Sequence, residues 1–435
     1  MKKLLIITYY WPPSGGAGVR RWLKFVKYLR EFGWEPVIYT AENPEVPAID
    51  HSLEADVPDN IEVIKTKIWE PFSIYKRFVG RKKDDKIKAG FLSEGKTPSL
   101  TEKMSVWVRG NLFIPDARKF WILPSIKYLK AYLKENPVDA MVSTGPPHSM
   151  HMIALGVKKK FNIPWLADFR DPWTNIDFYQ DLMLTGFADK KHHRLEQKVL
   201  KKADLITTVS TNWAKDFKKL GATNIEVVTN GFDTDDFSVL SGSKSGKFEI
   251  CHLGSMNKDR NPGVLWNVLA DLCKSIEGFK ENLKITFLGF TDYAVTKSLE
   301  DEGLLGFTEM VKYLPHKEVL QKAKKASILL LPLNNTPNVN GIIPGKLFEY
   351  LALKRPIFCV GDVHGDSSRI IDETKSGVTV DFDDGVGMRK YFLEKYKGFK
   401  STEGFIVESV GTEKYSRKAL TERMAALLDR ITEES

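Results

Sequence analysis

Short apolar runs alternate along this chain with longer stretches in which apolar residues recur every three or four positions. The short runs have the length of buried strands, and the longer stretches have the period of amphipathic helices. One such helical stretch places Trp22, Phe25, Val26 and Leu29 on a single face. Strands are expected over residues 4–8, 36–40, 61–65, 139–143, 165–168, 205–209 and 226–229. This alternation predicts a parallel sheet covered by helices.

A second series of the same kind begins at Phe248. Its strands are expected over residues 248–253, 285–288, 328–331 and 356–360, and its helices over 262–274, 317–325 and 344–353. The Gly/Ser-rich segment 238–246 separates the two series and is typical of a linker. We therefore expect an α/β protein with two Rossmann-like domains, 1–237 and 247–412. Residues 413–435 contain a further amphipathic helix, which can pack back on the N-terminal domain or on its neighbour.

Size and composition fit this division. A chain of 435 residues is too long for one comfortable core. Its three cysteines are scattered, so neither a disulfide framework nor a CxxC metal site is suggested. The apolar start is followed by Trp11-Pro12-Pro13 and not by a small-residue cleavage site, which favours a buried first strand over a signal peptide. We expect a cytoplasmic protein.

The net charge of +9 is unevenly distributed along the sequence. An insertion at about residues 70–122 is rich in Lys and Arg, interleaved with aromatic residues such as Phe78, Phe91, Trp107 and Phe113. Such a mixture suits peripheral contact with an anionic membrane, here at its inner face. The alternative is a solvated insertion without a partner. Nucleic acid is not an expected partner.

In a parallel sheet, the loops that follow the strands gather at one edge, where ligands bind. Gly15 and Gly16 follow the first strand and let the backbone approach an anion at the start of a helix. Their spacing is not the dinucleotide fingerprint, so an NAD site is not favoured. Asp168, Arg170 and Asp171 follow the fifth strand. These groups suit acid–base chemistry or a clamp on sugar hydroxyls, and the alternative is an ion pair that holds the turn.

His148 and His151 follow the fourth strand and can share a helix face. A metal would need further ligands that the sequence does not supply. We therefore expect polar contacts from these two residues and no metal site.

The most informative segment is 340–352, in which a loop with Pro344 opens a helix. Lys346 and Glu349 lie one turn apart on the same face of this helix, so a cation lies beside the free N–H groups and a carboxylate lies one turn deeper. The helix start and Lys346 suit a phosphate, and Glu349 can accept hydrogen bonds from the two hydroxyls of a ribose. The alternative is an ordinary amphipathic helix with two solvated charges.

A second group of candidate phosphate ligands follows the strand that ends at Leu253. Ser255 offers a backbone N–H group, and Lys258 and Arg260 can reach phosphate oxygens. Together with Lys346 they would neutralise a diphosphate. Taken alone, Lys258 and Arg260 are equally typical of a charged surface.

In their order and spacing, these segments resemble glycosyltransferase family 4, whose members have the GT-B fold. The resemblance extends over nearly the whole chain and rests on Tyr10-Trp-Pro-Pro-Ser-Gly-Gly16, Asp168-Phe-Arg-Asp-Pro-Trp173, Thr229-Asn-Gly-Phe-Asp233, Gly254-Ser-Met-Asn-Lys-Asp-Arg260 and Pro344-Gly-Lys-Leu-Phe-Glu-Tyr-Leu-Ala352. It is similar to the subset that acts on bacterial surface polysaccharides or lipid-linked sugars. The resemblance implies two facing domains with an interdomain cleft, a nucleotide-diphosphate sugar as co-substrate in the C-terminal domain, and a saccharide or lipid-linked acceptor on the N-terminal domain. It also implies retention of anomeric configuration and neither an obligatory metal nor a cofactor.

Carried over by position, the resemblance implies a role for each candidate. Glu349 would hold the donor ribose, Lys346 and Arg260 its diphosphate, while Gly15 and Gly16 would meet the distal phosphate or sugar. Further expected donor contacts are Ser255, Lys258 and Gly345. Asp171 is expected to contact the reacting sugar or acceptor, Asp168 and His148 are further catalytic candidates, and Arg170 and Trp173 are expected acceptor contacts.

Two departures from the family pattern leave alternatives open. Many relatives have a glutamate eight positions before Glu349, where this chain has Gly341, and backbone N–H groups of residues 340–345 are one replacement. Many relatives also have a histidine where this chain has Arg170 and Asp171. A nucleotide-sugar 2-epimerase shares the two-domain design, and a binding protein without turnover would keep the nucleotide site.

Overall fold

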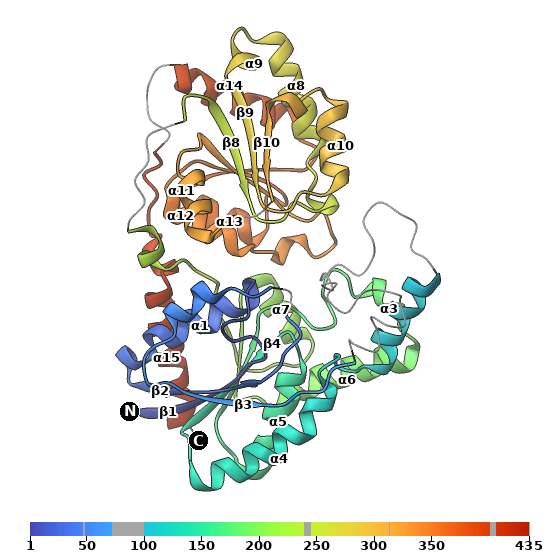
Figure 1. Ribbon diagram of the computed structural model, residues 1–435, viewed down its shortest axis with the longest axis vertical. Helices are drawn as coiled ribbons and strands as arrows, with labels where there is room; N and C mark the ends of the chain where they lie inside the picture. Colours follow the sequence, from blue (N-terminus) through green and yellow to red (C-terminus); the bar gives the residue numbers. More distant parts are fainter. Residues whose placement is uncertain (47, 72–99, 239–244, 313, 401–405, 435) are drawn as a thin grey trace. The chain divides into compact units, whose positions relative to one another are not determined.

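The computed structural model describes residues 1–46, 48–71, 100–238, 245–312, 314–400 and 406–434. The chain divides into two units, one made of Met1–Asn230 with Arg417–Ser435 and the other of Gly231–Ser416. Each unit is a parallel sheet with helices on both faces (Figure 1), as the alternation predicts. The division falls at Asn230 and not in the Gly/Ser-rich segment, because Phe232 is buried in the core of the C-terminal unit and its N–H donates to the carbonyl of Tyr415.

The N-terminal sheet has the strand order β3-β2-β1-β4-β5-β6-β7, and every neighbouring pair is parallel. The strands are β1 (Lys2–Ile7), β2 (Trp34–Ala41), β3 (Glu62–Thr66), β4 (Ala140–Gly145), β5 (Trp165–Phe169), β6 (Leu205–Thr208) and β7 (Ile225–Val227). These match the seven expected strands. In the sheet's register, Leu4 pairs with Pro36 on one side and with Ala140 on the other.

Helices cover both faces of this sheet. They are α1 (Ala17–Leu29), α3 (Leu100–Leu112), α4 (Lys119–Glu135), α5 (Ser149–Phe161), α6 (Gly186–Lys202), α7 (Thr211–Lys219) and α15 (Arg417–Glu433), with short 3-10 turns η1 (Arg30–Phe32), η2 (His51–Asp56) and η3 (Gln180–Leu182). The apolar face of α1, including Trp22, packs with Met424 and Leu428 of α15 against the sheet. On the other face, α5 packs on β4 and α4 packs on α5. The C-terminal helix therefore returns to the N-terminal unit.

The C-terminal sheet has the strand order β10-β9-β8-β11-β12-β13. Its strands are β8 (Phe248–Leu253), β9 (Leu283–Leu288), β10 (Thr308–Val311), β11 (Ile328–Pro332), β12 (Ile357–Val360) and β13 (Gly377–Val380). The four expected strands are the central ones. The two that were not expected, β10 and β13, lie at the sheet edges and are only partly buried, so they lack a continuous apolar run.

The helices of the C-terminal unit again lie on both faces of the sheet. They are α8 (Gly263–Ser275), α9 (Phe279–Asn282), α10 (Tyr293–Asp301), α11 (His316–Ala323), α12 (Gly345–Leu353), α13 (Asp366–Glu373) and α14 (Gly385–Lys400), with 3-10 turns η4 (Thr234–Phe237), η5 (Lys258–Arg260), η6 (Leu305–Phe307), η7 (Val339–Gly341) and η8 (Glu413–Tyr415). Side chains of α8, α10 and α14 join one core cluster, and those of α11, α12 and α13 join the other. α12 is the helix that follows β11, so its start lies among the loops that follow the strands.

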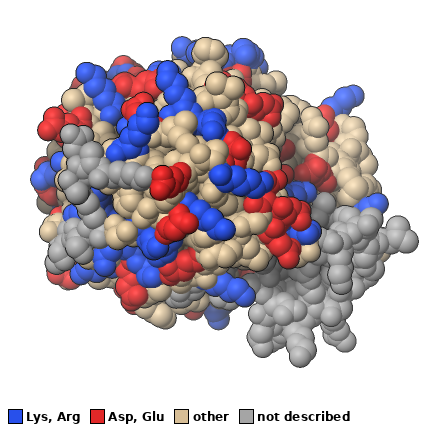
Figure 2. Space-filling view, turned by 90° about the horizontal axis from the view of Figure 1, so that it is seen from above, with Lys and Arg blue, Asp and Glu red and all other residues tan. Residues whose placement is uncertain are grey.

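On the face shown in Figure 2, Lys and Arg are interspersed with Asp and Glu, so the charged side chains drawn there do not form a patch of one sign. Most of the basic insertion, including Phe78 and Phe91, lies outside the described residues. In the part that is described, no helix is both long and apolar enough to cross a membrane. The same residues contain no group of three or more His, Cys, Asp or Glu side chains arranged to hold a metal ion.

Candidate active site

The helix predicted to bind the donor is present as α12. Pro344 is its N-cap residue, and no side chain caps its start. The N–H of Leu347 donates to the carbonyl of Pro344, whereas no bond of the Gly345 and Lys346 N–H groups is found among the described residues. These two groups are therefore available to a ligand, where the helix dipole favours an anion. Leu347 and Tyr350 face the core, so Lys346 and Glu349 share the opposite, partly exposed face.

The ammonium of Lys346 is held by a neutral imidazole. Its Nζ lies 3.1 Å from Nε2 of His252, whose Nδ1 lies 3.0 Å from the carbonyl oxygen of Leu330. Nδ1 therefore carries the proton, and Nε2 accepts from Lys346. Burial, together with the nearby charge of Arg260, lowers the pKa of Lys346 well below its ordinary value. In the described chain no carboxylate forms an ion pair with Lys346, so this cation lacks an anionic partner of its own.

The loop after β8 places a second cation beside the first. Nε of Arg260 donates to Oδ1 of Asn334 at 2.6 Å, and Nη1 donates to the carbonyl of Ser255 at 3.2 Å. These bonds fix the guanidinium near Lys346, in accord with the predicted role of Arg260. Lys258 is exposed, and no contact of its side chain is found within the described residues. Its expected phosphate contact stays a prediction.

Gly254 and Gly289 allow the backbone conformation of this loop. Gly254 has a φ of +80°, and a Cβ there would lie 3.4 Å from Nζ of Lys346. Gly289 has a φ of +150°, and a Cβ there would lie 2.5 Å from the carbonyl oxygen of Gly254. A larger residue at position 289 would displace the backbone of Gly254, whereas at position 254 the left-handed φ disfavours other residues.

Glu349 has a partner that the sequence analysis missed. Its Oε1 lies 2.9 Å from Nε2 of His316, the first residue of α11, and both side chains are about one quarter exposed. A ribose would share this carboxylate with His316 or displace it. No motif pointed to His316, because it meets Glu349 only through the fold.

The position that carries a glutamate in many relatives is the buried end of η7. The N–H groups of Gly341 and Ile342 donate to the carbonyls of Asn338 and Val339. They cannot also bind a sugar, so the expected backbone replacement is wrong for these two groups. Within the described residues, Gly345 keeps an unpaired N–H.

On the N-terminal unit, Asp168 lies at the centre of a closed network. It is fully buried and accepts hydrogen bonds from Arg21, Trp22, Thr144 and Thr207 at 2.8–3.3 Å. Burial alone raises a carboxyl pKa, but the charge and hydrogen bonds of Arg21, with those of Trp22 and Thr144, hold the pKa of Asp168 below its usual value. An enclosed carboxylate does not reach a substrate. We therefore correct its predicted role from a catalytic residue to a positioning residue.

Arg170 and Asp171 differ in their contacts. The guanidinium of Arg170 donates to the carbonyls of Gly145, Pro146 and Gly18, so it ties its own loop to the end of β4 and to the start of α1. Asp171 is partly exposed, and no hydrogen bond of its carboxylate is found among the described residues. Burial raises its pKa, against the charge of Arg170. Of the three predicted catalytic residues, Asp171 is the one whose carboxylate remains available.

His148 and Trp173 are stacked on each other. Their ring centroids are 4.5 Å apart and the ring planes are nearly parallel. Trp173 is only 3% exposed, so it does not offer the acceptor surface that was expected. Nε1 of Trp173 donates to Nδ1 of His192 at 3.0 Å, and Glu196 accepts from the backbone N–H of Trp173. Nδ1 of His148 has no hydrogen-bond partner in the described chain. Burial lowers the pKa of His148 well below its usual value.

The glycine loop after β1 is only partly suited to an anion. The N–H of Gly15 donates to the carbonyl of Ala48 at 2.9 Å and is thus occupied. Gly16 is exposed, has a φ of +96° and is the N-cap residue of α1. The expected phosphate contact is therefore left to Gly16 and the first turn of α1.

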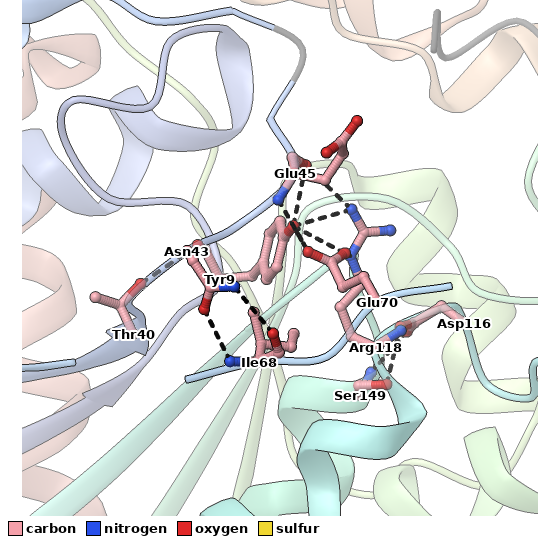
Figure 3. Close-up of polar contacts among 9 residues, drawn as sticks. All are labelled: Tyr9, Thr40, Asn43, Glu45, Ile68, Glu70, Asp116, Arg118 and Ser149. Atoms are coloured by element: carbon pink, nitrogen blue, oxygen red, sulfur yellow. Dashed lines mark hydrogen bonds and ion pairs between the residues drawn. The ribbon is translucent and has the colours of Figure 1, made fainter. Parts of the chain in front are cut away.

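A polar cluster near the carboxyl ends of β1–β3 was not predicted (Figure 3). The hydroxyl of Tyr9 lies 2.9 and 3.0 Å from the two carboxylate oxygens of Glu70, and Nη2 of Arg118 donates to it at 3.2 Å. Asp116, two residues before Arg118, accepts from the backbone N–H and the hydroxyl of Ser149 and so caps α5. These residues are far apart in sequence and share no motif, and only the fold brings them together.

Solved structures share this architecture over the whole chain. A sucrose-phosphate synthase from Thermosynechococcus elongatus is 13% identical, with a TM-score of 0.63 and 100% of both chains covered. TarM of S. aureus, in complex with Fondaparinux, alpha-GlcNAc-glycerol and UDP, is 13% identical, with a TM-score of 0.61 and coverage of 99% of this chain and 100% of TarM. A putative UDP-N-acetylglucosamine 2-epimerase from Listeria monocytogenes is 9% identical, with a TM-score of 0.55 and coverage of 100% and 97%. At such identities the likeness establishes the fold, which is GT-B.

A comparison of the sequence with family models gives a match over part of the chain. Residues 91–236 match the model of Glycosyltransferase Family 4. The resemblance inferred from the motifs is confirmed over these residues, and the fold of the chain is GT-B. A comparison with curated proteins gives no match.

Proposed function

We propose that this chain transfers a glycosyl group from a nucleotide-diphosphate sugar to a saccharide or lipid-linked saccharide, with retention of anomeric configuration and without an obligatory metal. The C-terminal unit binds the donor, and the N-terminal unit binds the acceptor. One observation carries the proposal: Lys346 stands at the uncapped start of α12, close to Arg260, and no carboxylate pairs with it among the described residues. A diphosphate is the anion that such a pair of cations suits.

The electrostatics account for catalysis. As the bond between sugar and phosphate breaks, negative charge grows on the diphosphate. Lys346, Arg260 and the first-turn N–H groups of α12 are fixed in place, so they stabilise this charge without reorganising. A bound diphosphate also raises the pKa of Lys346 again, which keeps the lysine protonated during the reaction. The acceptor hydroxyl gives its proton to the leaving phosphate.

On the acceptor side, Asp171 is the proposed contact to the reacting sugar or the acceptor. Its available carboxylate and raised pKa suit a hydrogen bond from a sugar hydroxyl. Arg170 and Asp168 hold the loops around it. Nδ1 of His148 is enclosed beneath Trp173, so it does not reach such a substrate.

The donor site is tested by thermal shift with a panel of UDP-, GDP- and dTDP-sugars. A donor at 100 times its dissociation constant stabilises the protein by about 2.7 kcal/mol. We expect Lys346→Met to lose most of this shift. Lys274→Met is the matched control, because that lysine is exposed in the last turn of α8 in the same unit and has no expected donor contact, and it should keep the shift. Equal shifts for the two variants would contradict the assigned diphosphate contact.

A second comparison separates the ribose from the diphosphate. With the nucleoside diphosphate as ligand, Glu349→Ala should lose the thermal shift. With inorganic pyrophosphate, which has no ribose, Glu349→Ala should behave as the unmodified chain, whereas Lys346→Met should bind neither ligand. Loss of pyrophosphate binding in Glu349→Ala would contradict the assignment of this carboxylate to the ribose.

Because the fold is shared with the putative epimerase, epimerisation of the donor is a second candidate reaction. Incubating the donor without an acceptor distinguishes the candidates by NMR. Slow release of nucleoside diphosphate supports the transferase, isomerised donor supports the epimerase, and binding with neither product supports a binding protein. Once an acceptor is found, the anomeric configuration of the product tests retention, and turnover in EDTA tests metal independence.

A further inference from the structure

Three neighbouring segments of the N-terminal unit expose large apolar side chains. Leu123 on α4 and Phe187 on α6 are both 76% exposed, Leu112 at the end of α3 is 54% exposed, and Trp69 is 53% exposed. Trp107 on α3 and Phe120 on α4 are also exposed. We call these six residues, with the lysines beside them, the apolar–basic surface.

Hydrogen bonds and ring contacts join the three segments. Nζ of Lys119, at the start of α4, donates to the carbonyl of Leu112 at 2.6 Å, and the ring of Phe120 lies 4.7 Å from that of Trp69. The side chain of Asn111 bonds the carbonyl of Met183 and the N–H of Thr185, just before α6. In Figure 1, α3 lies beside α6 at the edge of the unit. The exposed side chains therefore form one surface.

Each helix combines an exposed apolar residue with a lysine one turn away. The pairs are Lys103 and Trp107 on α3, Leu123 and Lys127 on α4, and Phe187 and Lys191 on α6, each four positions apart and exposed on one helix face. A lysine one helical turn from an exposed apolar side chain can place its ammonium among charged headgroups while the apolar side chain lies in the acyl region of a membrane. A surface for an apolar protein partner does not need this repetition.

The positive charge of this surface is not neutralised by its neighbours. Lys119 packs over the rings of Phe113 and Phe120, and within the described residues neither it nor Lys191 forms an ion pair. Nearby carboxylates are engaged elsewhere: Asp116 caps α5, and Asp189 contacts Tyr179 and His193. A second copy docked by twofold symmetry would bring the same positively charged surface against this one, which is unfavourable. An anionic, flat and apolar partner fits better.

We propose that the apolar–basic surface docks this protein on an anionic lipid bilayer, with the apolar tips of α4 and α6 entering the interface and the lysines at the headgroups. The proposal does not depend on the reaction proposed above. It differs from the sequence-based expectation of membrane contact, since it assigns the contact to α3, α4 and α6 together. The start of α6 lies outside the basic insertion of the sequence.

The surface is directly connected to the candidate acceptor site. Nε2 of His192 on α6 lies 3.4 Å from the carbonyl oxygen of Gly110 on α3, and Nδ1 accepts from Trp173, which stacks on His148. One imidazole thus links the docking helix to the loop that carries Asp171. A lipid-linked acceptor held in the bilayer would be presented beside that loop.

The test is co-sedimentation of the full chain with vesicles of phosphatidylcholine alone and of phosphatidylcholine with phosphatidylglycerol, at low and high salt. We expect binding to the anionic vesicles only, weakened by salt. Leu123→Glu with Phe187→Glu should lower vesicle affinity by about tenfold or more, because two inserted side chains are replaced by repelled charges. Lys119→Gln with Lys191→Gln should lower it by roughly fivefold per lysine. Leu123, Phe187 and Lys191 are exposed, so their substitution should leave the melting temperature unchanged. Lys119 also bonds the carbonyl of Leu112, so Lys191→Gln alone is measured beside the double lysine variant.

Val386 and Lys390 on α14 provide the matched control. Val386 is 83% exposed, and Lys390 follows it four positions later, but they lie in the other unit. Val386→Glu and Lys390→Gln should bind vesicles as the unmodified chain does. Equal binding by the Leu123→Glu/Phe187→Glu variant, or binding that ignores lipid charge, would overturn the proposal. So would light scattering that shows a dimer lost in that variant without any vesicle binding.

Discussion

Asp168→Asn is a sharp test of how the N-terminal unit positions its site. The substitution keeps the shape of the side chain and removes its charge. Arg21, which is 1% exposed, would then be a buried cation without its anionic partner. Its other donations, to the carbonyls of Val228 and Thr229, do not supply a charge. The expected result is a large loss of stability and not only a loss of activity.

The magnitude follows from the burial of both partners. Removing one member of a buried ion pair costs about 3–5 kcal/mol, whereas an exposed pair contributes about 0–1 kcal/mol. For a unit of this size, each kcal/mol lowers the melting temperature by about 2–4 °C, so the N-terminal unit should melt about 6–20 °C lower. Because the pKa of Asp168 is depressed in the folded state, the contribution of its charge is complete above the unfolded carboxyl pKa of about 4. That contribution is lost as the pH falls through the folded pKa.

The assay is thermal unfolding by calorimetry, with Asp181→Asn as the control. Asp181 is exposed, so its substitution should change stability by no more than about 0.5 kcal/mol. Arg21→Met should cost less in the Asp168→Asn background than alone, since the buried charge then leaves with its partner. If Asp168→Asn has the same melting temperature as Asp181→Asn, the structural role of the Asp168 carboxylate is refuted, and a catalytic role regains support.

Two further predictions concern the backbone and the pH. Gly289→Ala should lower the melting temperature and weaken donor binding, because its Cβ would collide with the backbone of Gly254 beside Lys346; Gly303→Ala, with a positive φ but open space around it, is the control that keeps donor binding. Burial lowers the pKa of His151 in the folded state to about 3. As the pH falls below about 6.5, His151 is therefore protonated in the unfolded state before it is protonated in the folded state, and the free energy of unfolding decreases. Protonation of His151 should lower the free energy of unfolding by roughly 2 kcal/mol between pH 6.5 and pH 5. In urea unfolding, the stability of His151→Gln should therefore depend less on pH than that of the unmodified chain.

Much of the fold could be predicted because the strands are buried on both faces. β8 is buried at every position, and its expected bounds, 248–253, are those observed. The edge strands β10 and β13 were missed because half-exposed strands have no such run. The domain boundary was displaced since Phe232 packs into a core whose other residues come much later in the chain.

The candidate site was predictable only where its residues are close in sequence. Lys346 and Glu349 share one helix, and their spacing alone puts them on one face. His316, His252 and Arg21 meet their partners across more than thirty positions, so no local pattern indicates them. The role of Asp168 was misjudged for the same reason, because its hydrogen-bond donors come from three separate elements, α1, β4 and β6.

The return of α15 to the first unit has a consequence for biosynthesis. Leu420, Met424 and Ile431 complete the core of the N-terminal unit, yet they are translated only after the whole of the C-terminal unit. The C-terminal unit is one continuous stretch and can finish its core earlier, whereas the unit translated first must wait with part of its apolar face uncovered. A chain released before α15 is made would leave that face open to chaperones and to aggregation.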